Sequence, residues 1–200
     1  MTLSKGILSF SIISILFFAC ESDEYKTAHS YFEQGEYTKA IEQYNEYLEE
    51  EPTHIESLYN RGRAYEELGE YDKSLASYKE TLEVEPENVN ALMSIGKYHF
   101  RNEGYKDAAF YFDKAAQVHK NDAQAHYLAG RAFHKSGETD KALQAYNAAI
   151  SANKDLGEAY LYRGALKVYQ GNESGGCEDF NLAKSLSVAE AQEAINQYCN

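Results

Sequence analysis

Eight residues of this sequence could form one binding surface, because their types and spacing repeat. Three basic residues stand 34 apart, each with a large side chain four positions earlier, and two have a second cation four positions later: Tyr59, Arg63, Met93, Lys97, Arg101, Tyr127, Arg131 and Lys135, here termed the basic row. Like charges four residues apart destabilise a helix by about 0.2–0.5 kcal/mol, so their presence in a chain of net charge −13 favours a binding role. Tyrosine and arginine are also common at recognition surfaces. The basic row therefore predicts a surface for an acidic protein or peptide partner.

A solvated charged face is the alternative interpretation of the same residues. Glu66, Glu67 and Glu103 lie on neighbouring turns and could neutralise the cations. Such surface ion pairs contribute little to stability. The sequence leaves both interpretations open.

The composition is that of an ordinary globular chain, with 44% hydrophobic and 26% charged residues. A surface that binds nucleic acid needs clustered lysine and arginine to neutralise phosphates. The net charge of −13 argues against such a surface, and we expect no nucleic-acid partner.

Catalytic chemistry finds little support in the sequence. The six histidines have no spacing typical of a metal site: His29, His54, His99, His119, His126 and His134. We therefore expect no metal, no cofactor and no catalytic residue. The alternative is a hydrolase or metal-dependent enzyme on a helical scaffold, which would require a buried pocket where histidines and carboxylates converge.

The first 19 residues have the pattern of an export signal. Lys5 precedes an apolar run from Ile7 to Phe18, which is short for a membrane span and typical of a signal-peptide core. The sequence Phe17-Phe18-Ala19-Cys20 resembles the cleavage box of bacterial lipoproteins, although phenylalanines replace the usual leucine and small residue. This resemblance implies that Cys20 is acylated and anchors the mature protein to a membrane. An ordinary signal peptide or an uncleaved anchor is the alternative.

Two cysteines remain once Cys20 is assigned to lipid. Cys177 falls near the start of one expected helix, and Cys199 falls at the end of the next. Antiparallel packing of these two helices would bring the cysteines together. A disulfide between them is chemically reasonable outside the cytosol. The alternative is a pair of reduced, partly buried thiols.

An internal repeat supplies the elements that position these residues. Gly62, Gly96, Gly130 and Gly164 recur at the interval of the basic row, and a row of aromatic residues keeps the same interval: Tyr44, Tyr78, Phe112, Tyr146 and Phe180. A glycine within a helix costs about 1 kcal/mol relative to alanine. Glycine at one phase of successive helices therefore indicates a close approach between helices.

The second copy carries a recognisable pattern: Leu58, Gly62, Tyr65, Gly69, Tyr71, Ser74, Tyr78 and Pro86. It resembles the tetratricopeptide repeat, a helix-turn-helix unit whose length equals the interval seen here. The resemblance implies an all-α superhelix, a solenoid, over residues 20–190. We expect five repeats, at about 21–54, 55–88, 89–122, 123–156 and 157–190, and a C-terminal capping helix at 188–200 that begins near Val188.

In proteins of this family the stripe that the basic row occupies lines a concave groove, where extended peptides or partner helices bind. Another mode of the family clamps a terminal carboxylate with lysine and asparagine side chains. Asn60 matches one clamp position, but Tyr25, His29, Asn90 and Ser94 occupy the others. We therefore do not expect that clamp here.

Helix ends can also be predicted in the second repeat. Thr53 and Glu56 form a possible capping box for its first helix, and Gly69 is placed to end that helix. Asp72 is placed to cap the second helix, and Pro86 to stop it.

These observations together predict an exported, lipid-anchored, non-catalytic adaptor or assembly factor of the bacterial cell envelope. It would sit on a membrane, most simply the outer membrane, on its periplasmic or its surface side, and hold an acidic partner in its groove. A passive envelope spacer is the remaining alternative.

Overall fold

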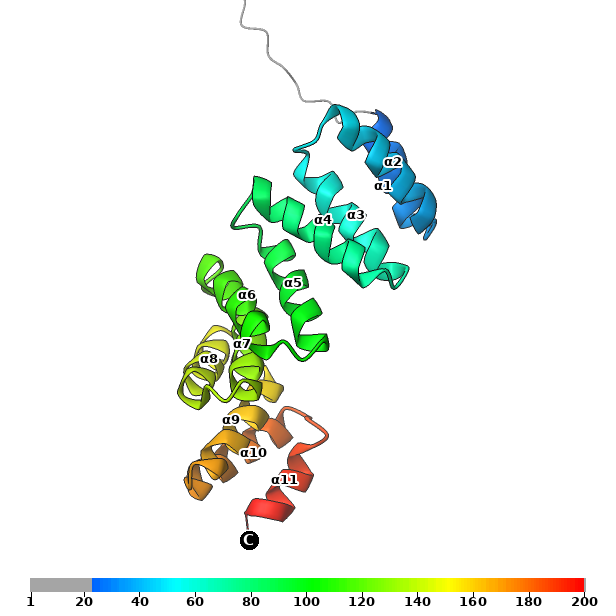
Figure 1. Ribbon diagram of the computed structural model, residues 1–200. Helices are drawn as coiled ribbons and strands as arrows, with labels where there is room; N and C mark the ends of the chain where they lie inside the picture. Colours follow the sequence, from blue (N-terminus) through cyan, green and yellow to red (C-terminus); the bar gives the residue numbers. More distant parts are fainter. Residues whose placement is uncertain (1–22, 200) are drawn as a thin grey trace, which may run out of the picture.

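The computed structural model describes residues 23–199. Within this range the chain forms eleven α-helices and no β-strand (Figure 1). They are α1 (Asp23–Glu33), α2 (Tyr37–Glu50), α3 (Ile55–Glu67), α4 (Tyr71–Val84), α5 (Val89–Arg101), α6 (Tyr105–Val118), α7 (Ala123–Lys135), α8 (Thr139–Ala152), α9 (Gly157–Tyr169), α10 (Glu173–Ser185) and α11 (Ala191–Tyr198). The all-α fold class is confirmed.

The helices are arranged as five pairs that follow one another along an elongated array, from α1 and α2 at one end to α11 at the other (Figure 1). The first helices of the last four pairs begin at Ile55, Val89, Ala123 and Gly157, which keep the interval of the sequence repeat. We call the first helix of each pair an A helix and the second a B helix. The superhelix of five helix-turn-helix repeats is thus confirmed.

The turn between the two helices of each repeat uses one left-handed backbone position. Four of the five turns place glycine there, with φ between 74° and 85°: Gly35, Gly69, Gly137 and Gly171. The third repeat has Glu103 at that position, with φ of 59°. Because all five positions keep the same interval, the exchange of glycine and glutamate in this turn does not disturb the register.

The glycines on the A helices make room for the aromatic rings of the B helices. A β-carbon on Gly62 would stand 2.7 Å from the ring of Tyr78, and one on Gly96 would stand 2.6 Å from Phe112. Each ring therefore lies on the glycine of its own repeat. Tyr78 also belongs to a core cluster with Ile95 of the following repeat. Its ring therefore fills the contact between the two helices of its own repeat and the contact with the next repeat.

The structure corrects two helix caps. His54, and not Thr53, caps α3, because its Nδ1 accepts a hydrogen bond from the backbone N–H of Ser57 at 3.2 Å. The prediction that Asp72 caps α4 is also wrong. That helix follows Glu70, which makes no side-chain cap, and the Asp72 carboxylate accepts a hydrogen bond from the Tyr98 hydroxyl at 2.7 Å.

The C-terminal helix closes the array as expected, although it begins at Ala191 and not near Val188. Ala191 is fully buried and packs in a cluster with Tyr160 and Ala183. Cys177 and Cys199 form a disulfide with Cα atoms 5.7 Å apart, which ties the end of this helix to α10.

The expected signal peptide and Cys20 lie outside the described residues. No helix within residues 23–199 is long and apolar enough to cross a membrane.

Candidate functional site

The A helices together present one surface, here termed the A-helix face, and cation–ring contacts join the first two of them and the last three. The guanidinium of Arg63 on α3 lies over the ring of Phe32 on α1, at 4.5 Å. Arg131 on α7 lies over Phe100 on α5 at 5.0 Å and over Tyr162 on α9 at 5.3 Å. The basic row therefore crosses successive repeats on one face of the array.

Arg131 is the central cation of this face. It is partly buried and lies among rings from three successive repeats, including Tyr127 of its own helix at 5.8 Å. No carboxylate among residues 23–199 forms an ion pair with Arg131. Ring faces attract a cation through their quadrupole without cancelling its charge. The positive charge of Arg131 therefore remains available to a ligand.

Arg101 has a different environment, because the chain neutralises it. Its guanidinium stacks on Tyr71 at 4.0 Å and pairs with the Glu66 carboxylate at 3.6 Å. For Arg101, therefore, the alternative interpretation holds, in which a glutamate on a neighbouring turn neutralises the cation. Lys97 and Lys135 are exposed, and within the described part of the chain neither has an ion-pair partner. The structure thus divides the basic row into neutralised and unneutralised cations.

The large side chains of the basic row are buried or partly buried and do not form an open contact surface. Tyr127 is 7% exposed, and Met93 packs against two core clusters. Tyr59 is partly buried, with its ring 5.4 Å from that of Tyr78. Tyr127 lies beneath the Arg131 guanidinium, and these partly or fully buried side chains offer a ligand little area of their own.

Three tyrosines form a cluster beside Arg131. The ring centroids of Tyr127, Tyr146 and Tyr162 lie 5.9–6.4 Å apart. Burial raises the pKa of Tyr127 to about 12 and also raises that of Tyr146, while the Arg131 charge opposes both shifts. Both phenols are therefore protonated at neutral pH and can donate hydrogen bonds.

The clamp position that Asn60 matches is not open to a ligand. Asn60 is 9% exposed, and its amide donates to the Tyr25 hydroxyl at 3.5 Å.

A second set of charged residues, which the sequence reasoning missed, lies between the A and B helices of the last repeat. The Asp179 carboxylate, 2% exposed, accepts hydrogen bonds from Arg163 at 2.6 and 2.8 Å and pairs with Lys167 at 2.8 Å. Arg163 also donates to Asn147 at 2.7 Å.

The same arrangement recurs in weaker form three repeats earlier. Arg61 donates to Asn45 and Ser77, at 3.0 and 3.1 Å, and pairs with Glu80. Comparing equivalent positions of the second and fifth repeats would have found this network in the sequence. It is satisfied internally, so it holds repeats together and does not bind a ligand.

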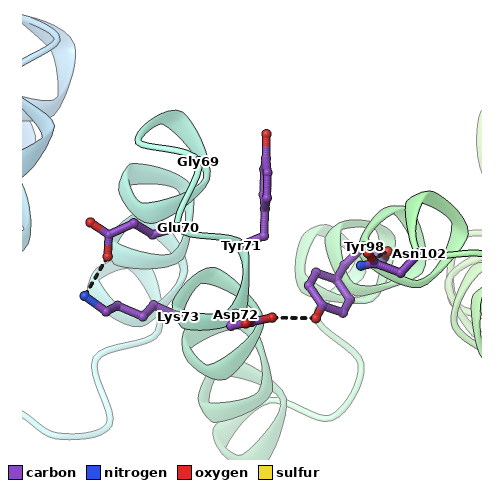
Figure 2. Close-up of a pocket in the computed structure, with 7 residues that line it drawn as sticks. All are labelled: Gly69, Glu70, Tyr71, Asp72, Lys73, Tyr98 and Asn102. Carbon is purple, nitrogen blue, oxygen red and sulfur yellow. Dashed lines mark hydrogen bonds and ion pairs between the residues drawn. The ribbon is translucent and has the colours of Figure 1, made fainter.

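An open recess of about 380 Å³ lies at the junction of the second and third repeats (Figure 2). Tyr98 donates to Asp72 at 2.7 Å, and Lys73 pairs with Glu70 at 2.6 Å (Figure 2). Tyr71 also lines the recess and is 42% exposed. Since these polar groups bind one another, they are not available to bind a ligand, and we do not assign a binding site to the recess.

Metal chemistry has no arranged ligand set in the part of the chain that the structure describes. Within residues 23–199 no group of three or more histidine, cysteine, aspartate and glutamate side chains is placed to hold a metal ion. Several histidines instead contact rings, such as His54 with Tyr25 at 4.9 Å and His99 with Tyr111 at 5.6 Å.

Comparisons with known proteins agree with this architecture. A family model described as tetratricopeptide repeat matches residues 25–83, 59–120 and 93–160. No curated protein sequence matches the chain.

Similar solved structures are helical repeat proteins. A crystal structure of MamA is 23% identical, with a TM-score of 0.73, and the match covers 86% of this chain and 97% of that one. MamA from Desulfovibrio magneticus RS-1 is 21% identical, with a TM-score of 0.73 and coverage of 83% and 96%. YrrB, described as a TPR protein with an unusual peptide-binding site, is 20% identical, with a TM-score of 0.77 and coverage of 86% and 90%. At these identities the likeness shows the fold alone.

Proposed function

The chain belongs to the tetratricopeptide repeat family, and we propose that it is a non-catalytic scaffold that holds an acidic protein or peptide on its A-helix face. Repeats of this kind stack into extended surfaces that bind partners. The peptide-binding site named for YrrB, a protein of the same fold, supports a binding role of this general kind.

The observation that carries the proposal is that Arg131 has no carboxylate partner in the described chain. This cation lies on the A-helix face among aromatic rings, and no carboxylate of the described chain pairs with it. Lys97 and Lys135 add two exposed positive charges to the same row, in a protein of net charge −13. A partner segment with carboxylates would complement these charges, and steering by them would raise its association rate.

The second part of the proposal is a membrane location. A lipid on Cys20 would leave only two residues before α1, which begins at Asp23. The first repeat would then lie close to the bilayer. We propose that the protein is an adaptor or assembly factor on a bacterial envelope membrane, most simply the outer membrane.

A crosslinking pull-down from intact membranes tests the binding surface. We choose Lys97→Glu with Lys135→Glu, because both lysines are exposed and neither holds the core together. The matched control is Lys79→Glu with Lys184→Glu, two exposed lysines on α4 and α10, which changes the net charge equally. We expect the first variant to lose partners that the wild type and the control retain. Equal capture by all three forms would contradict the proposed surface, and no capture by any form would favour a passive spacer.

Metabolic labelling with palmitate tests the anchor. We expect the wild-type protein to incorporate label and to fractionate with membranes, and Cys20→Ser to do neither. Labelled Cys20→Ser protein would overturn the assignment of the lipid to this cysteine.

A further inference from the structure

A hollow on the A-helix face between the fourth and fifth repeats has an unusual lining. Its volume is about 190 Å³, and Arg131, His134, Lys135, Tyr146 and Tyr162 line it. None of these side chains is acidic. Burial, and then the charge of Lys135, lowers the pKa of His134, so this imidazole is neutral at neutral pH. The fixed charges of the lining are therefore the two cations.

The Tyr146 side chain carries a hydroxyl that the fold does not use. The residue is 0% exposed, and its hydroxyl oxygen is buried without a hydrogen-bond partner in the described structure. An unpaired buried polar group is costly, and most such groups in proteins are paired. Packing does not require the hydroxyl, because Phe112 and Phe180 fill the equivalent position in the third and fifth repeats.

The second repeat shows what satisfies this hydroxyl. There the equivalent residue, Tyr78, donates to the Glu66 carboxylate at 2.8 Å. In the fourth repeat His134 stands at the position that Glu66 holds in the second. Arg131 keeps the cation at the position of Arg63, although the guanidinium that pairs with Glu66 in the second repeat is that of Arg101, from the following repeat. The fourth repeat therefore has the hydroxyl of the second repeat and a guanidinium lining the same hollow, but lacks the carboxylate.

We propose that this hollow binds a carboxylate supplied by the partner, which takes the place that Glu66 fills in the second repeat. The carboxylate accepts a hydrogen bond from Tyr146 and pairs with Arg131 and Lys135. Because the hydroxyl is buried, binding requires a shift of a neighbouring side chain, such as the Tyr162 ring, whose centroid lies 6.3 Å from that of Tyr146. The carboxylate comes from an acidic side chain or from a chain terminus. This inference rests on the proposed binding role of the A-helix face and adds one subsite to it.

Three short peptides distinguish these sources in an NMR titration of the full chain. The probes are acetyl-Ala-Glu-Ala-amide, acetyl-Ala-Ala-Ala with a free terminal carboxylate, and acetyl-Ala-Gln-Ala-amide, which carries no carboxylate. We expect saturable shifts of the Arg131 side-chain N–H signals with at least one of the first two probes and none with the third. Shifts of equal size with the glutamine peptide would overturn the proposal.

Two conservative variants test the role of the hydroxyl. Tyr146→Phe should fold, because phenylalanine occupies this position in two other repeats, and it should weaken binding of the carboxylate probe about tenfold or more. Tyr44→Phe is the matched control, since it removes a tyrosine hydroxyl on α2 that is likewise buried and has no partner in the described part of the chain. We expect this control to bind as the wild type does. Unchanged affinity in Tyr146→Phe, or an equal loss in both variants, would refute the subsite.

The subsite and the proposed function fail separately. Capture of a partner by both wild type and Tyr146→Phe, with no carboxylate binding at Arg131, would refute the subsite and leave the proposed function intact. Carboxylate binding at Arg131 without any captured partner would support the subsite and refute the adaptor function.

Discussion

The ring of Tyr146 lies against Gly130 so closely that a β-carbon on the glycine would stand 2.6 Å from it. The same relation joins Gly62 to Tyr78, two repeats earlier. This contact fixes the separation of the A and B helices. In the fourth repeat it also holds the Tyr146 ring against the hollow beside Arg131. The packing of the repeat and the proposed carboxylate subsite thus share one side chain.

Gly130→Ala should therefore destabilise the protein by about 1–3 kcal/mol, the usual cost of overpacking a core. Urea unfolding followed by circular dichroism measures this loss. Gly104→Ala is the control, because its β-carbon would meet no atom closer than 3.4 Å. The control should be neutral or slightly stabilising. Equal stability of the two variants would show that the ring and helix move apart without cost.

Asp179→Ala should be among the most damaging single substitutions. It leaves Arg163 and Lys167 without the carboxylate that both contact in a buried setting, and losing one partner of a buried pair costs about 3–5 kcal/mol. Ser77→Ala, at the equivalent position in the second repeat, removes one hydrogen bond from Arg61 and should cost about 0.5–1.5 kcal/mol. Chemical denaturation compares the two. A smaller loss for Asp179→Ala than for Ser77→Ala would contradict the structural role of this network.

Reducing the disulfide should loosen only the C-terminal end of the array. The bond joins residues 22 apart, and a loop of that size contributes about 3 kcal/mol in the chain-entropy model. Because each repeat contacts only its neighbours, we expect faster hydrogen exchange in α10 and α11 and little change in α1–α6. Cys177→Ser with Cys199→Ser should reproduce the effect without reductant. Mass spectrometry of the protein purified without reductant that finds both thiols alkylated would contradict the bond.

Stability should fall at alkaline pH because of buried tyrosines. Burial raises the pKa of Tyr44, Tyr78, Tyr127 and Tyr146 in the folded state, to about 12 for Tyr127. The unfolded chain releases these protons near pH 10, while the folded chain retains them. Their contribution is thus complete below about pH 10 and is lost as the pH rises through the folded pKa values.

Denaturation at a series of pH values, with tyrosinate absorbance as the second signal, checks this dependence. Each of these tyrosines should add a slope of about 1.4 kcal/mol per pH unit in that range. Tyr146→Phe should reduce the alkaline slope by the contribution of one tyrosine. At neutral pH it should be as stable as the wild type or more so. A steeper alkaline loss in Tyr146→Phe would refute the assignment.

The constant repeat interval was sufficient to predict the fold. It determined the number of repeats, the paired helices and the contact of glycine with an aromatic ring, because each repeat buries its apolar surface only against itself and its neighbours. The Cys177–Cys199 pairing followed from the order of the last two helices. Acylation of Cys20 stays a prediction, since that residue lies outside the described structure.

Only the tertiary structure decided which polar groups meet. Spacing placed Arg101 and Arg131 on the same face, but helix packing brought Glu66 to the first and aromatic rings to the second. It likewise brought the Glu66 carboxylate to the Tyr78 hydroxyl, whereas the Tyr146 hydroxyl has no partner among residues 23–199. A periodic sequence specifies the face on which a side chain lies. Its hydrogen-bond partner depends on the few ångströms and degrees at which successive repeats stack, which the interval does not encode.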